Sequence, residues 1–310
     1  MSFARRTAIA GTTMANARPA PSADRYYVPH GSPWPFFGSV ALFVLMSGAA
    51  LTLEQAGLGP IVLSAGLLML CALFVGWFGI VIRENEAGVY NQQVDRSFRL
   101  GMAWFIFSEV MFFAAFFGAL FYARQLALPR LAGQTANYVT HSLLWSQFEG
   151  GWPSNGPAAL GPRANGSFGT IAALGVPAVN TMILLTSGFT VTLAHHALLA
   201  GKRGMLKLFL AVTFVLGFVF VGLQAQEYHH AYSELGLQLG TGIYGSTFFM
   251  LTGFHGFHVT LGAIMLLVVW LRVLKGHMTA ESHFAFEGVA WYWHFVDVVW
   301  LGLYVFVYWL

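Results

Sequence analysis

Long apolar stretches alternate with short polar segments along most of this sequence. The apolar stretches cover about residues 34–53, 59–82, 100–122, 171–199, 205–226, 241–271 and 284–308. A helix of about 20 apolar residues is long enough to cross the roughly 30 Å hydrocarbon core of a bilayer. The pattern therefore predicts an all-α integral membrane protein with seven transmembrane helices.

The polar segments predict how these spans are connected. We expect a polar N-terminal tail at residues 1–31, spans one and two within residues 32–82, and an inner loop at 83–99. Residues 100–310 should hold spans three to seven, with a long outer loop at about 123–170. That loop is rich in glycine and proline, which favour turns over helix.

The composition excludes an ordinary soluble fold. Hydrophobic residues make up 57% of the chain and charged residues only 9%, whereas soluble domains carry roughly 25% charged residues. The net charge is +3, but the basic residues flank the spans instead of forming one patch. Membrane topology therefore explains them better than a nucleic-acid partner does.

The distribution of lysine and arginine predicts the orientation. Positive residues beside membrane spans are retained on the side of synthesis. If the N-terminus lies inside and the C-terminus outside, 12 of the 15 basic residues lie on the inner side. The three outer ones, all in the long loop, are Arg124, Arg130 and Arg163.

Glu109 is the most informative polar residue within a span. It lies among phenylalanines near the middle of the third apolar stretch, where a carboxyl group is costly to ionise. One interpretation is a proton-handling carboxyl. The other is an acid that is hydrogen-bonded to a neighbouring helix and fixes the packing, and the sequence weighs the two about equally.

Histidines in the later spans raise the question of a metal site. His255 and His258 share one face of the sixth span, but Gly253 and Gly256 beside them favour close helix contact and interhelical hydrogen bonds. His195 and its neighbour point about 100° apart and do not easily serve one metal. We therefore assign no metal ligand and no catalytic residue, and expect Glu109 to hydrogen-bond His255 or His258.

Two functions of other classes compete at this point. The first is an independent proton transporter with Glu109 as the carrier group, although we find no internal repeat of the kind that many transporters show. The second is a haem-bearing membrane oxidoreductase, for which His196 and His258 are the candidate axial ligands.

Several motifs together resemble the cytochrome c oxidase subunit III family, in the order in which that family carries them. The resemblance implies a non-catalytic subunit of an aa3-type haem-copper oxidase, in which helices 1–2 and helices 3–7 form two bundles around a V-shaped lipid cleft. It implies no redox centre in this chain, since haem a, haem a3, CuA and CuB belong to partner subunits I and II. The motifs are Pro33-Trp34-Pro35, residues 107–113 (FSEVMFF), Ala194-His195-His196, residues 244–249 (YGSTFF), residues 253–258 (GFHGFH) and residues 291–300 (WYWHFVDVVW).

The resemblance also implies roles for single residues. Glu109 matches the family's reactive intramembrane glutamate. Composition alone favours ordinary positive-inside residues at the inner ends of spans two and six, but the resemblance implies phospholipid binding there. The residues concerned are Trp77, Arg83, Glu84, Arg272 and Lys275, although Phe78, Tyr90 and Asn91 depart from the family pattern nearby.

The remaining expectations concern proton uptake, partners and location. Histidines titrate near neutral pH, so we expect His30, His277 and His283 on the inner side to help collect protons for the catalytic subunit. The seven spans favour a cytochrome c oxidase over a quinol oxidase, which usually lacks the first two. We expect a bacterial inner membrane, with the mitochondrial inner membrane as the alternative, and association with a cytochrome bc1 complex is a further open option.

Overall fold

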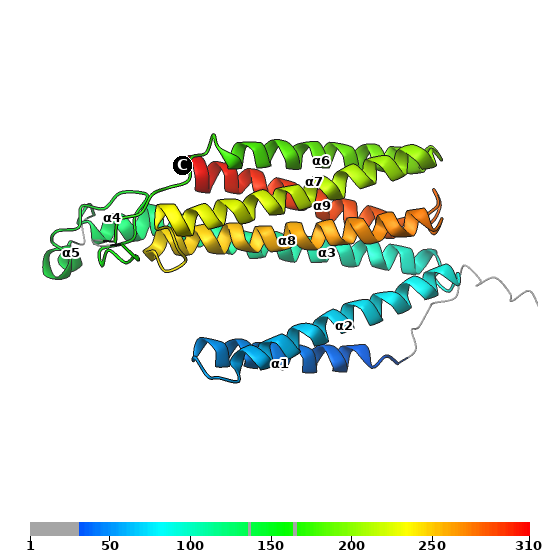
Figure 1. The fold of residues 1–310 in the computed structure, drawn as a ribbon, viewed down its shortest axis with the longest axis horizontal. Coiled ribbons are helices and arrows are strands. Elements are labelled where there is room, and N and C mark those ends of the chain that lie inside the picture. Colours follow the sequence, from blue (N-terminus) through cyan, green and yellow to red (C-terminus); the bar gives the residue numbers. More distant parts are fainter. Residues whose placement is uncertain (1–30, 136–137, 164–165) are drawn as a thin grey trace, which may run out of the picture. The chain divides into compact units, whose positions relative to one another are not determined.

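The computed structural model describes residues 31–135, 138–163 and 166–310. Within these ranges, seven helices are long and apolar enough to cross a membrane, which confirms the predicted all-α membrane fold. They are α1 (Trp34–Leu53), α2 (Gly59–Glu86), α3 (Gln92–Tyr122), α6 (Val176–Leu199), α7 (Arg203–His230), α8 (Gly242–Leu274) and α9 (Phe284–Leu303) (Figure 1).

The chain divides into two compact units, one ending at Ser97 and the other beginning at Phe98. In the first unit, α1 and α2 form an antiparallel hairpin that depends on two glycines. A Cβ atom on Gly48 would lie 2.2 Å from the backbone nitrogen of Leu63, and one on Gly66 would lie 2.5 Å from Cα of Leu45. Small residues of this kind let membrane helices approach closely enough for their backbones to touch.

In the second unit, α6, α7, α8 and α9 pack side by side, and α3 packs against α8 and α9 (Figure 1). Trp293 of α9 lies at the centre of this bundle and is fully buried. Its indole Nε1 donates a hydrogen bond to Ser187 Oγ of α6 at 2.9 Å. Its ring lies against Gly217 of α7 and Gly262 of α8, so one side chain contacts three other helices.

The first helix, α1, has the predicted bounds of 34–53, whereas several other helices begin or end differently from the predicted spans. Most of the expected inner loop at 83–99 is helical, because α2 continues to Glu86 and α3 begins at Gln92. The prediction followed apolarity, whereas a membrane helix can continue into the polar interface. There Asn91 Oδ1 accepts a hydrogen bond from the backbone nitrogen of Val94 at 3.1 Å and so supports the start of α3.

The fourth span differs from its predicted start, whereas the last span, Phe284–Trp309, agrees with its predicted bounds to within one residue. Helix α6 begins at Val176 instead of about residue 171, with Pro177 in its first turn, where proline's fixed φ suits a helix start. Helix α9 ends at Leu303, and a π-helical segment, Tyr304–Trp309, continues it. Another π-helical segment, Ala231–Leu235, follows α7.

The long loop between α3 and α6 contains short helical pieces. A π-helical segment, Ala123–Ala127, is followed by α4 (Leu128–Leu131) and α5 (Val139–Leu144). Turns make up much of the rest, and they are held on the ends of the bundle helices. The Arg163 guanidinium donates to the Glu234 carbonyl, and the Tyr244 backbone nitrogen donates to the Ser154 carbonyl at 3.1 Å.

Basic residues gather at one end of the second unit, where α6 and α8 end and where α7 and α9 begin (Figure 1). We call this the basic end. Two of these cations, Arg272 and Lys275, lie in the last turn and at the C-cap of α8, where the helix dipole favours positive charge. The residues are Arg99, Lys202, Arg203, Lys207, Arg272 and Lys275.

Candidate functional site

Glu109 of α3 and His258 of α8 form a polar contact inside the second unit. Glu109 Oε2 lies 2.9 Å from His258 Nε2, and both side chains are mostly buried. Of the two histidines expected beside Glu109, the structure therefore brings His258 within hydrogen-bond distance. The contact joins two helices that are far apart in the sequence.

The second ring nitrogen of His258 decides how a proton is placed in this contact. His258 Nδ1 lies 2.6 Å from the carbonyl oxygen of Phe254, and a carbonyl can only accept, so Nδ1 carries a proton. His258 Nε2 then either accepts from a protonated Glu109 or, in the imidazolium, donates to the carboxylate. In both cases, one proton lies between the two side chains and can move along a single O–N contact.

Aromatic rings surround this pair. The ring of Phe113 lies 5.1 Å from that of His258, and the rings of Phe112 and Tyr292 lie 6.1 Å and 6.3 Å from it, between centroids. The Tyr292 hydroxyl also donates to the His258 carbonyl at 3.4 Å. Such a shell fixes the orientation of the imidazole and strengthens the hydrogen bond by lowering the local dielectric constant.

His255 has a different environment. It is fully buried, and its Nε2 donates to the Val296 carbonyl of α9 at 3.2 Å. Its ring packs against Trp300 at 5.1 Å and Phe220 at 5.7 Å between centroids. His255 therefore joins α8 to α9 and is engaged in packing, as the sequence predicted for a structural histidine.

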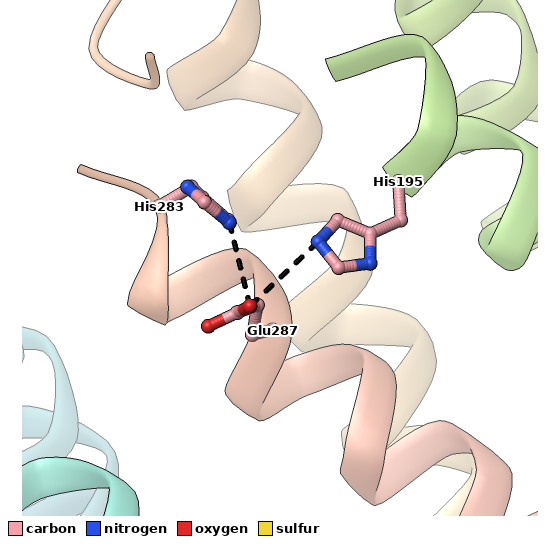
Figure 2. A group of neighbouring side chains, drawn as sticks. All are labelled: His195, His283 and Glu287. Carbon is pink, nitrogen blue, oxygen red and sulfur yellow. Dashed lines mark ion pairs between the residues drawn. The ribbon is translucent and has the colours of Figure 1, made fainter. Parts of the chain in front are cut away.

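A second cluster of ionisable side chains lies at the basic end and was not predicted from the sequence. Glu287, in the first turn of α9, forms an ion pair with Arg99 of α3. Its Oε1 lies 3.4 Å from His283 Nε2 and 3.8 Å from His195 Nε2 of α6. Figure 2 shows the two imidazoles pointing toward the same carboxylate from different helices. In the sequence, the one sign of this cluster is the i, i+4 spacing of His283 and Glu287, which places both side chains on one face of a helix.

The last span holds a second acidic residue. Asp297 Oδ2 lies 3.8 Å from His294 Nδ1, beyond hydrogen-bond distance. Asp297 is mostly buried, and its carboxylate lies against Gly188 of α6, where a Cβ atom would come within 2.3 Å of Oδ2. Asp297 therefore faces α6, and His294 Nε2 lies 3.3 Å from Thr192 Oγ1 of the same helix.

The residues expected to bind phospholipid lie at helix ends in both units. In the first unit, Trp77 is exposed and Arg83 lies in the last turn of α2. Glu84 accepts a hydrogen bond from the Tyr90 hydroxyl at 2.6 Å, so the residue that departs from the family pattern engages this carboxylate. In the second unit, Arg272 and Lys275 lie in the last turn and at the cap of α8, respectively.

The three histidines expected to collect protons fall in different parts of the chain. His283 lies at the start of α9 beside Glu287, and His277 lies in the turn after α8. Both belong to the basic end. His30 lies outside the described residues.

Comparison with known proteins identifies the family. The family model for cytochrome c oxidase subunit III matches residues 24–138 and 138–310. The chain belongs to the cytochrome c oxidase subunit III family. Its relatives include the cytochrome c oxidase subunit 3 of Coturnix japonica, which is 39% identical over 291 residues, or 94% of this chain and 98% of the relative. The subunit of Danio rerio is 40% identical over the same shares, and that of Rattus norvegicus is 41% identical over 92% and 96%.

Membership of the subunit III family settles the broad class of function. The subunit belongs to an oxidoreductase complex and is itself non-catalytic. These relatives are named as cytochrome c oxidase subunits, which does not favour the quinol oxidase alternative. The geometry also argues against His258 as a haem ligand, because Phe254 and Glu109 already engage both of its ring nitrogens.

Proposed function

We propose that this chain is the non-catalytic subunit III of an aa3-type cytochrome c oxidase and that it supports proton uptake by the catalytic subunit. The observation that carries the proposal is the gathering of ionisable side chains at the basic end, where one nitrogen of His195, one nitrogen of His283 and one carboxylate oxygen of Glu287 lie within 4.8 Å of one another. His277 lies in a turn at the same end. Imidazole and carboxylate groups that share a small region can pass protons among themselves.

These side chains would act by supplying protons locally to the catalytic subunit. Histidine exchanges protons near neutral pH, and a group of such residues at the membrane interface raises the rate at which protons are captured. The catalytic subunit consumes protons during oxygen reduction, so a collecting surface beside its uptake path matters most where bulk protons are scarce. The effect should therefore grow with pH.

Replacing His30, His277 and His283 together with asparagine should lower oxidase turnover at alkaline pH, by up to about tenfold, the low end for electrostatic concentration of a charged substrate. Turnover of the purified oxidase measured against pH checks this. The matched control replaces His229 and His230, which are exposed near the opposite end of the second unit. A pH profile of the triple variant that matches the wild type would refute the proton-collecting role.

We further propose that Trp77, Arg83 and Glu84 of the first unit, and Arg272 and Lys275 of the second unit, bind phospholipid head groups, as the resemblance implies. Guanidinium and ammonium groups at helix ends attract anionic phosphates. The exposed ring of Trp77 on α2 supports this assignment, because tryptophan favours the head-group level of a bilayer.

Replacing Arg83 and Arg272 together with glutamine should reduce the phospholipid retained by the purified oxidase, since each cation is worth roughly 1 kcal/mol near an anionic surface. Mass spectrometry of extracted lipid, normalised to haem, measures the amount. The control replaces Arg124 and Arg130 of the long loop. Equal lipid content in both variants and the wild type would count against the proposed lipid sites.

The remaining parts of the proposal concern partners and location. The chain packs directly on subunit I and associates with subunit II, and haem a, haem a3, CuA and CuB reside in those partners. A supercomplex with a cytochrome bc1 complex would be compatible with this arrangement. We propose a bacterial inner membrane as the location of the protein, with the mitochondrial inner membrane as the alternative.

A further inference from the structure

We propose that Asn180, Gln224 and Glu227 bind a cluster of ordered water molecules inside the second unit, near the end opposite the basic end. Asn180 lies near the start of α6, and Gln224 and Glu227 lie on one face near the end of α7. All three residues are almost completely buried, with exposed fractions of 0%, 5% and 3%, respectively. This inference does not depend on the proposed proton-uptake role.

The packing of α6 against α7 places Asn180 and Gln224 at the same depth in the bundle. The two helices run antiparallel (Figure 1), and Ser187 of α6 and Gly217 of α7 both contact Trp293. Asn180 precedes Ser187 by seven residues, and Gln224 follows Gly217 by the same interval. Seven residues advance a helix by about 10.5 Å and return nearly to the same face. Both amide side chains therefore lie at one level beyond the central indole.

Trp300 of α9 and Tyr308 of the last π-helical segment enclose this level. Trp300 Nε1 donates to Thr181 Oγ1 at 2.9 Å, and its ring lies 4.7 Å from the Phe220 ring between centroids. The Tyr308 ring lies 5.9 Å from the Trp300 ring, and its hydroxyl donates to Glu227 Oε1 at 2.6 Å. The polar side chains of α6 and α7 thus border one enclosed region behind these aromatic rings.

Polar atoms in this region have hydrogen-bonding capacity that the protein does not fill. Oδ1 and Nδ2 of Asn180, Oε1 and Nε2 of Gln224, and Oε2 of Glu227 are buried and make no hydrogen bond within the described part of the chain. The Tyr228 hydroxyl lies near Gln224, but it forms its hydrogen bond with Thr252 Oγ1 at 2.7 Å. A buried polar group without a partner is costly, so these atoms require a ligand.

Water fits this set of groups better than a metal ion does. The unpaired atoms include NH₂ donors as well as oxygen acceptors. A cation would bind the oxygens and leave both NH₂ groups unpaired, whereas a buried water donates and accepts and makes about three hydrogen bonds. Because Tyr308 is bonded to Glu227, the bound water joins α6 and α7 to the segment Tyr304–Trp309.

Replacing Asn180 with leucine tests the site by the sign of its effect on stability. Leucine is close to asparagine in size and removes both amide atoms. With water bound, the change leaves that water short of partners, so the equilibrium constant for unfolding of the full chain in mixed micelles, as SDS is added, should rise by about tenfold. In a dry site, the change would remove two unpaired atoms and lower the constant. A lower or unchanged constant for Asn180→Leu would overturn the proposal.

The matched control for this variant is Thr186→Val. Thr186 lies on the same helix but is exposed, so its replacement should leave the unfolding constant within about twofold of the wild type. Gln224→Leu should act in the same direction as Asn180→Leu, because both amides face the same water. Opposite effects of the two leucine variants would contradict a shared site.

A second measurement detects the water itself in the intact wild-type oxidase. X-ray pulses convert water to hydroxyl radicals that label adjacent side chains, and brief mixing with ¹⁸O-labelled water before the pulse distinguishes trapped water from bulk water. Mass spectrometry should find mainly ¹⁶O on the buried Tyr308 and mainly ¹⁸O on Tyr232, which is 45% exposed at the same end. An unlabelled Tyr308, or equal isotope ratios on the two tyrosines, would refute the water site.

Discussion

Replacing Trp293 with alanine should lower the free energy of unfolding of this chain by about 3 kcal/mol, at the lower end of the range for large-to-small changes at buried aromatic residues. The indole contacts Ser187 on α6, Gly217 on α7 and Gly262 on α8. Since lipid tails are as apolar as the protein core, the loss comes from van der Waals contacts and an unfilled cavity more than from exposure to water. Unfolding of the purified chain in mixed micelles, followed by circular dichroism as SDS is added, measures the loss.

The matched control for this prediction is Trp291→Ala. Trp291 lies on the same helix but is 38% exposed, so its removal leaves no enclosed cavity and should cost less than about 1 kcal/mol. Trp293→Phe should fall between the two, because it keeps most of the ring and loses the hydrogen bond to Ser187. Equal losses for Trp291→Ala and Trp293→Ala would show that the bundle does not depend on the central indole.

Replacing Glu109 and His258 should show strong coupling between them. Either single change, Glu109→Leu or His258→Leu, leaves a polar partner inside the membrane and should cost about 1–3 kcal/mol. The double variant should be more stable than either single variant, because replacing both partners by apolar groups removes the stranded polar atom. The same SDS titration supplies the four free energies of this double-mutant cycle.

His255 provides the control for this cycle. Its hydrogen bond goes to the Val296 carbonyl, so Glu109→Leu and His255→Leu should add without coupling, within about 0.5 kcal/mol. If the losses of unfolding free energy caused by Glu109→Leu and His258→Leu were instead additive, the contact between the two side chains would contribute nothing to stability. That outcome would favour a role for Glu109 outside the packing of α3 on α8.

The candidate site was predictable to different degrees. Glu109 could be identified from the sequence because an acid within a long apolar stretch is rare. The sequence could not show whether His255 or His258 is its partner, since both lie on one face of α8. The packing of the helices decides it, because His258 contacts α3 whereas His255 contacts α9. The basic-end cluster was missed because Arg99, His195 and Glu287 come from three helices whose contacts no sequence spacing encodes.

The sequence by itself determined the seven membrane helices, because their length and apolarity are set by the thickness of the bilayer. It also determined the asymmetry of basic residues, which depends only on their order along the chain. Tertiary structure decided where polar groups meet. It extended α3 back to Gln92, aligned Glu109 with His258, and brought His195 beside His283 and Glu287, because side-chain contacts depend on the rotation and register of packed helices, which apolar patterning leaves open.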